Sequence, residues 1–157
     1  MVNLIDLVRR QCIYLDLVAA DQNQALAAVT RRMVAGGVLS AADQPELLRR
    51  LTERESLCST AVGHGAAIPH CYYDKLTTPL IVIGRLSSPI HYCSPDERQV
   101  DLIFLLLGPE RVPAMHIQIL SRIVRLLKDE RFDEELRRAD SPEAVLAALR
   151  EVESRHH

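Results

Sequence analysis

Residues 79–107 read PLIVIGRLSSPIHYCSPDERQVDLIFLLL, and this stretch contains the two segments that decide the fold. Pro79–Leu86 and Val100–Leu107 are nearly continuous apolar runs. Strands that are buried on both faces have this pattern, whereas half-exposed strands alternate apolar and polar residues. The residues between the two runs are rich in Ser and Pro, and a short edge strand is expected at Ile90–Cys93. The stretch therefore predicts two central strands of a sheet that is covered on both faces.

Apolar spacing predicts helices before and after these strands. Asp21 and Gln24 form a capping-box pattern at the start of the first helix. A short strand is expected at Cys12–Leu17. Residues 54–70 are expected to be irregular or to form short strands, as segments that display functional groups often do. The predicted helices, by residue number, are 21–35, 40–53, 113–128, 129–138 and a last one that begins at 141. These elements predict an α/β fold with a mixed central sheet flanked by several helices.

The length and composition favour one domain. A chain of 157 residues can bury roughly two thirds of its surface around a single core. Hydrophobic residues make up 48% of the chain but aromatic residues only 4%, so the core must be aliphatic. We expect one domain over residues 1–155, with His156 and His157 as a tag remnant.

The charge and the cysteines exclude several classes of protein. A net charge of −2 gives no reason to expect nucleic-acid binding. The apolar runs are far shorter than the roughly 20 residues that cross a bilayer, and no signal segment opens the chain, so a cytoplasmic protein without membrane insertion is expected. Four scattered cysteines without a CxxC pattern predict reduced thiols rather than a disulfide framework, and no cofactor is expected.

The segment 63–70, GHGAAIPH, presents His70 after a run of small residues and a proline. Small side chains let a bulky partner approach, and Pro69 restricts the backbone just before the imidazole. A neutral imidazole is able to attack phosphorus without a separate base. A Pro-His pair alone more often marks a structural or surface histidine, so further residues must support a catalytic role.

Supporting residues lie on both sides of this segment. His116 falls on the inward stripe of the helix predicted at 113–128, near a helix start that offers free N–H donors to an anion. Its alternative role is that of a core-edge histidine bonded to a backbone carbonyl. Upstream, Arg54 could recognise phosphate oxygens, and Ser59 and Thr60 could donate hydroxyl hydrogen bonds. Arg54 and Glu55 could equally form a solvated helix end.

Residues 51–70, LTERESLCSTAVGHGAAIPH, resemble the signature of EIIA components of the fructose/mannitol class of the bacterial phosphotransferase system (PTS). The similarity continues over about residues 4–152. The resemblance implies an α/β domain in which a small histidine phosphocarrier protein phosphorylates His70. It also implies that His116 helps to hold the phosphoryl group and that Arg54 and Thr60 line the same site. Such a protein is a phosphoryl carrier rather than a turnover enzyme alone.

The arrangement as a free-standing domain looks most like the nitrogen-regulatory branch of this family. EIIB, a potassium transporter and a sensor kinase are therefore candidate partners. The sequence departs from the family pattern at Cys71-Tyr72-Tyr73-Asp74 and at His64. These departures affect the rim of the site, where we expect Glu55, Cys71 and Tyr72 to contact a docking partner.

Three alternatives stay open from the sequence. The chain could be a docking module that acts with or without phosphorylation, or a sugar-specific EIIA subunit. The third alternative is a zinc site, which prefers four ligands in tetrahedral array, but the candidates lack CxxC or HxxxH spacing, so no metal is expected. These candidate ligands are His64, His70, Cys71 and either His91 or Cys93.

Overall fold

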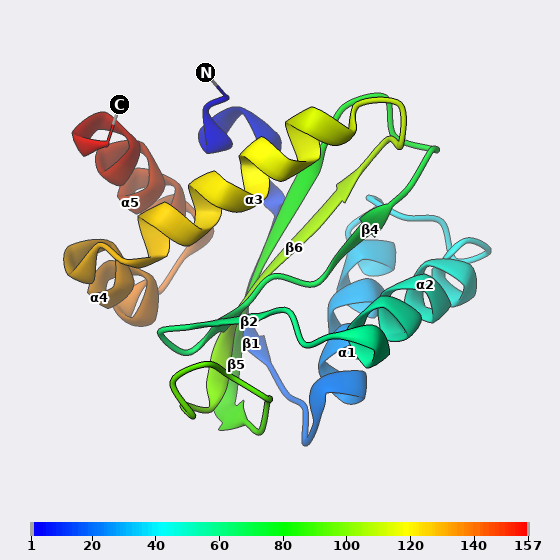
Figure 1. Ribbon diagram of the computed structural model, residues 1–157, viewed down its shortest axis with the longest axis horizontal. Helices are drawn as coiled ribbons and strands as arrows, with labels where there is room; N and C mark the ends of the chain where they lie inside the picture. The colour runs from blue at the N-terminus through cyan, green and yellow to red at the C-terminus, as the bar shows by residue number, and fades with distance from the viewer. Residues whose placement is uncertain (1, 157) are drawn as a thin grey trace.

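A six-stranded mixed sheet forms the centre of the computed structural model, which describes residues 2–156 (Figure 1). The sheet order is β1-β5-β6-β3-β2, and β4 also pairs with β6. Strands β5 and β6 are antiparallel to each other, β1 runs parallel to β5, and β3 and β4 run parallel to β6. The strands are β1 (Val8–Leu17), β2 (Ala61–Gly63), β3 (Ala66–Ala67), β4 (His70–Tyr72), β5 (Leu80–Ile90) and β6 (Val100–Gly108).

The prediction of two central buried strands is confirmed. Nearly every residue of β6 is buried, and so is β5 as far as Leu86. The short edge strand predicted at Ile90–Cys93 is wrong, because Ile90 is the last residue of β5 and pairs with Val100. Residues 91–93 have no strand structure. Strand β1 is longer than predicted and begins at Val8.

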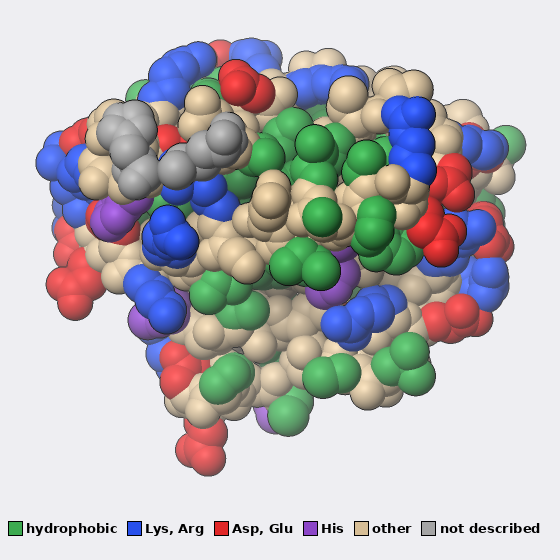
Figure 2. Space-filling model, turned by 45° about the horizontal axis from the view of Figure 1, so that its top comes forward, with side chains coloured by type: hydrophobic (Ala, Val, Ile, Leu, Met, Phe, Trp, Pro, Cys, Tyr) green, Lys and Arg blue, Asp and Glu red, His purple; other side chains and the backbone are tan. Residues whose placement is uncertain are grey.

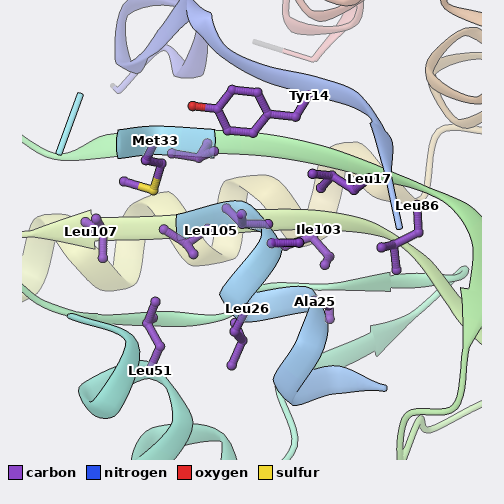
Figure 3. Packing of buried hydrophobic residues seen from close by; sticks show 14 of the residues in the cluster. Tyr14, Leu17, Ala25, Leu26, Met33, Leu51, Leu86, Ile103, Leu105 and Leu107 are labelled. Carbon is purple, nitrogen blue, oxygen red and sulfur yellow. The ribbon is translucent and has the colours of Figure 1, made fainter. Parts of the chain in front are cut away.

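Helices cover both faces of the sheet, as predicted. They are α1 (Gln22–Ala35), α2 (Gln44–Leu57), α3 (Pro113–Leu127), α4 (Glu130–Arg138) and α5 (Pro142–Arg155), with a short 3₁₀ helix η1 at Leu4–Leu7. Helices α1 and α2 lie on one face and α3, α4 and α5 on the other (Figure 1). Figure 3 shows side chains of the first face, among them Leu26 of α1 and Leu51 of α2, gathered against Leu105 and Leu107 of β6. No helix among residues 2–156 is long and apolar enough to cross a membrane.

Most helix boundaries follow the predicted caps. The Asp21 carboxylate accepts a hydrogen bond from the Gln24 amide at 2.8 Å, and Ser141 accepts one from Ala144 at the start of α5. The helix predicted over residues 40–53 is wrong at both ends, because α2 begins at Gln44 and continues to Leu57. The apolar stripe of α2 continues through a buried carboxylate at Glu55, which the sequence pattern treats as polar and therefore exposed.

His156, which directly follows the last helix, makes contacts with α3 and with the residue that precedes α4. The His156 carbonyl accepts a hydrogen bond from Arg122 Nη1 at 2.8 Å, and its ring nitrogen Nε2 lies 2.7 Å from Asp129 Oδ2. His156 therefore takes part in tertiary contacts. His157 lies outside the described residues.

Candidate phosphoryl-acceptor site

His70 is the first residue of β4, which pairs with the end of β6. Because side chains alternate along a strand, His70 and Tyr72 face the α3 side of the sheet. The His70 and His116 ring centroids are 5.5 Å apart, and the Tyr72 and His116 centroids are 5.1 Å apart. The two histidines, 46 positions apart in the chain (116 minus 70), therefore share one site.

One ring nitrogen of His70 is committed to the backbone. Nδ1 lies 2.7 Å from the carbonyl oxygen of Ile68. A carbonyl oxygen only accepts, so Nδ1 must carry the hydrogen and donate it, which leaves the lone pair of the neutral ring on Nε2. The ring is half-buried. Burial lowers the pKa of His70 from its ordinary value of 6.5, and the Arg54 charge lowers it further, although the Ile68 carbonyl and the Glu55 charge oppose these effects.

His116 lies in the first turn of α3, which begins at Pro113. Its ring is almost completely buried, and Nδ1 has no hydrogen-bond partner. Burial, followed by the nearby His70, lowers the pKa of His116 to about 4, so the ring is neutral near pH 7. Because Nδ1 has no partner, the alternative role, in which His116 is bonded to a backbone carbonyl, does not hold for this nitrogen.

A small pocket of about 160 Å³ lies beside the His70 ring. Its polar groups come from Ser59 and Thr60, at the turn between α2 and β2. The Thr60 hydroxyl donates to Glu55 Oε1 at 2.7 Å, whereas Ser59 Oγ accepts from the Ala61 amide and keeps its own hydrogen free of any acceptor among residues 2–156. Ser59 is therefore the available hydroxyl donor. The remaining lining residues are Ala61, Val62, Ile68, Leu120 and Val124.

Basic and apolar groups lie around this pocket. Arg54, in the last turn of α2, donates from Nη1 to the Cys58 carbonyl at 2.9 Å, and its charge acts on His70. Tyr72 on β4 is an exposed apolar side chain, and its ring lies beside His116. Figure 2 shows one face of the molecule with apolar side chains gathered in its middle and charged side chains around them.

Comparison with known proteins identifies the family. Residues 6–152 match the family model described as "Phosphoenolpyruvate-dependent sugar phosphotransferase system, EIIA 2". The chain belongs to this EIIA family. It is 36% identical over 146 residues to a nitrogen regulatory protein of Bradyrhizobium diazoefficiens, covering 93% of this chain and 94% of that protein. It is also 30% identical over 151 residues to the 2-O-alpha-mannosyl-D-glycerate-specific EIIABC component of Escherichia coli, of which it spans 23%.

Solved structures confirm the EIIA fold. The nitrogen regulatory protein IIA-Ntr of Neisseria meningitidis superposes with a TM-score of 0.82 at 27% identity, covering 93% of this chain and 98% of that one. Enzyme IIA for mannitol, solved in its complex with phosphorylated enzyme IIB from Escherichia coli, superposes with a TM-score of 0.74 at 22% identity. That alignment covers 92% of this chain and 99% of the other.

Two residues that we expected at the docking rim of this EIIA domain lie elsewhere. The side chain of Cys71 points away from His70, toward the core that α1 and α2 form on the other face, and burial raises its thiol pKa to about 11. Glu55 is buried, and its carboxylate accepts hydrogen bonds from the Thr60 amide, the Thr60 hydroxyl and the Tyr92 hydroxyl. The docking role predicted for these two side chains is therefore corrected. Tyr72 stays exposed beside His116.

The sequence analysis did not single out Tyr92. This residue follows β5 and reaches Glu55 across 37 positions of the chain. No local pattern encodes a contact of that range. The ligands of the zinc alternative do not gather either, since residues 2–156 contain no group of three His, Cys, Asp or Glu side chains that could hold a metal ion.

The protonation of His70 predicts how this EIIA domain responds to pH. Only the neutral ring has a lone pair on Nε2, and burial lowers the pKa of the ring. As the pH falls, the rate of phosphoryl uptake is expected to hold past 6.5, the ordinary imidazole pKa, and to decrease only at more acidic pH. Single-turnover rates with a pre-phosphorylated donor, together with an NMR titration of His70, measure this. A His70 midpoint above 6.5 would contradict the prediction.

Proposed function

We propose that the chain is a regulatory phosphoryl carrier that accepts a phosphoryl group on Nε2 of His70 from a histidine phosphocarrier protein. The observation that carries the proposal is the hydrogen bond from His70 Nδ1 to the Ile68 carbonyl at 2.7 Å. It fixes the ring orientation and leaves the lone pair on the other nitrogen of a half-buried, neutral imidazole.

The transfer step needs no proton movement at His70. The Nε2 lone pair forms a bond to phosphorus while the bond from phosphorus to the donor's histidine nitrogen breaks, and the electron pair of the broken bond returns to the donor. Nδ1 keeps its hydrogen throughout. The Ile68 carbonyl then stabilises the positive charge that the phosphorylated ring acquires.

Three side chains near His70 suit the charge of the phosphoryl group. Arg54 supplies a positive charge that already acts on the ring, and Ser59 supplies a hydroxyl donor at the pocket. His116 is neutral, and its buried Nδ1 has no partner. A buried acceptor without a partner is tolerated better than a buried donor, so we assign the His116 hydrogen to Nε2, where it can donate to a phosphoryl oxygen.

Replacement of His116 by alanine is expected to slow phosphoryl transfer to His70 by about 100-fold, because removal of one donor to a developing oxyanion has an effect of that size. Rapid-quench measurement with a radiolabelled, phosphorylated donor gives the rate. His91→Ala, at an exposed histidine, is the matched control and should transfer at the wild-type rate. Equal rates for His116→Ala and the wild type would remove His116 from the site.

Phosphorylation itself is tested by incubating the wild-type chain with phosphoenolpyruvate and the general phosphotransferase proteins. We expect one phosphoryl group per chain, stable in base and labile in acid, as for a nitrogen–phosphorus bond. A chain that takes up no acid-labile phosphate under these conditions would overturn the carrier function.

The nitrogen-regulatory relatives support a regulatory role, and the mannitol complex supports an EIIB-type partner. A potassium transporter and a sensor kinase are further proposed partners, and the proposed location is the cytoplasm, with the phosphoryl donor. Pull-down experiments with His70→Asp and His70→Ala test whether phosphorylation controls docking. A partner that binds only one of the two variants supports a phosphorylation switch, and equal binding favours the docking module.

A further inference from the structure

Glu55 is the centre of a buried polar cluster behind the phosphoryl pocket. Its Oε2 accepts from the Thr60 amide at 2.6 Å, and its Oε1 accepts from the Thr60 hydroxyl at 2.7 Å and from the Tyr92 hydroxyl at 2.9 Å. All three side chains are at most 6% exposed. A buried carboxylate is stable only when donors satisfy its charge, and Tyr92 is the one donor that comes from outside the segment 55–60.

This cluster fixes one wall of the pocket beside His70. Thr60 lines the pocket, and both of its donor groups are bound to Glu55. The preceding residue, Arg54, holds the Cys58 carbonyl of the same turn. Two adjacent residues of α2 therefore hold the turn that carries Ser59. Arg54 binds it at Cys58, and Glu55 binds it at Thr60. The contact between Glu55 and Thr60 depends on Tyr92, because loss of the Tyr92 hydroxyl would leave Glu55 Oε1 with one buried donor fewer.

The cluster also satisfies the negative charge of Glu55, which acts on the ring that would carry the phosphoryl group. The Glu55 charge reaches the His70 ring, where it raises the pKa against the effect of burial. A phosphoryl dianion on that ring would be repelled by a carboxylate whose charge is not satisfied. Burial and the Glu55 charge both raise the pKa of the Tyr92 phenol, so the phenol remains protonated and continues to donate.

We propose that Tyr92 is a positioning residue for phosphoryl transfer to His70. Through Glu55 it holds the Ser59–Thr60 wall in place and keeps the Thr60 hydroxyl directed away from the incoming phosphoryl group. This role rests on the proposed function of His70. Tyr92 itself does not contact the phosphoryl group, because its side chain is buried behind the wall.

Tyr92→Phe tests the proposal because it removes only the hydroxyl. We expect the single-turnover rate of transfer to His70 to fall about ten-fold, since small displacements of a positioning group slow a reaction by ten- to a hundred-fold. The KM for the phosphorylated donor is expected to stay unchanged, because a buried side chain does not touch the donor. A variant that was merely less stable would show no selective loss of the chemical step at temperatures where it stays folded.

Tyr14→Phe is the matched control. Tyr14 is also a buried tyrosine and belongs to the same core cluster as Tyr92, but its hydroxyl has no partner among residues 2–156 and Arg32 of α1 lies over its ring. We expect this variant to transfer at the wild-type rate. A Tyr92→Phe rate within about two-fold of the wild type, or an equal loss in Tyr14→Phe, would overturn the positioning role.

Glu55→Gln provides a readout that does not require phosphorylation. The amide removes the charge that raises the pKa of His70, so an NMR titration should find a lower His70 pKa in this variant than in the wild type. An unchanged His70 pKa would show that the Glu55 charge does not act on the ring, and would overturn the electrostatic part of the inference even if the wild type were never phosphorylated. Failure of the wild type to accept phosphate, with the pKa difference present, would instead count against the proposed function alone.

Discussion

Replacement of His70 by alanine is expected to abolish phosphoryl uptake. The variant loses the nucleophilic nitrogen, and the remaining imidazole of the site cannot replace it, since His116 is only 6% exposed. A donor protein could therefore not bring its phosphorus atom in line with the His116 ring. Uptake is measured as acid-labile radiolabel after incubation with phosphoenolpyruvate and the general phosphotransferase proteins.

His70→Gln and His91→Ala complete this experiment. The glutamine side chain is polar and similar in size to imidazole but has no basic nitrogen, so it should also take up no phosphate. His91 is exposed and remote in sequence from the AIPH segment, and its alanine variant should be labelled to the wild-type level. Labelling of His70→Ala that equals the wild type would show that the acceptor is another residue.

The long apolar runs made the central part of the fold predictable. β6, and β5 as far as Leu86, are buried on both faces, so nearly all residues of these two runs are apolar and neither run has a polar face. Short strands were one of two expectations for residues 54–70, but their bounds were not predictable. The reason is that β2, β3 and β4 contain only two or three residues each and obtain their structure from pairing with β6 or with each other. Local sequence carries little information about such pairing.

Site residues were predictable where the apolar spacing of a helix determines which way a side chain points. The stripe on α3 placed His116 toward the protein interior, and the structure brings it to within 5.5 Å of His70. The direction of Cys71 was not predictable, because it depends on residues 70–72 forming a strand, in which neighbours face opposite sides. Burial of Glu55 depends on Tyr92, a partner that only the tertiary fold supplies.

Replacement of Glu153 by glutamine is expected to lower the free energy of unfolding by about 3–5 kcal/mol, the usual effect of removing one partner from a buried ion pair. The carboxylate of Glu153 in α5 is 3.1 Å from Arg122 Nε of α3, and both side chains are at most 7% exposed. It also accepts from the amides of Leu4 and Ile5 in η1 at 2.9 and 2.8 Å. One carboxylate therefore connects three elements of the α3 face.

The size of this effect follows from what remains buried. Glutamine cannot neutralise the Arg122 guanidinium, whose Nη2 already has no partner, and its single oxygen cannot satisfy both backbone amides. Glu143→Gln is the matched control, because Glu143 lies on the same helix and also pairs with an arginine, Arg10, but both side chains are more than half exposed. Solvent screens exposed pairs, which contribute little to stability, so this variant should unfold close to the wild type.

Denaturant unfolding of both variants measures the difference. Adding Arg122→Leu to Glu153→Gln should recover part of the lost stability, since it removes the uncompensated charge. It also places an apolar side chain in the core between the sheet and helices α3, α4 and α5, which Ile123 and Val152 help to form. Equal midpoints for Glu153→Gln and Glu143→Gln would show that the buried pair contributes no more than an exposed one. The same result would mean that water reaches Arg122 in solution, because only hydration could compensate its charge once the carboxylate is gone.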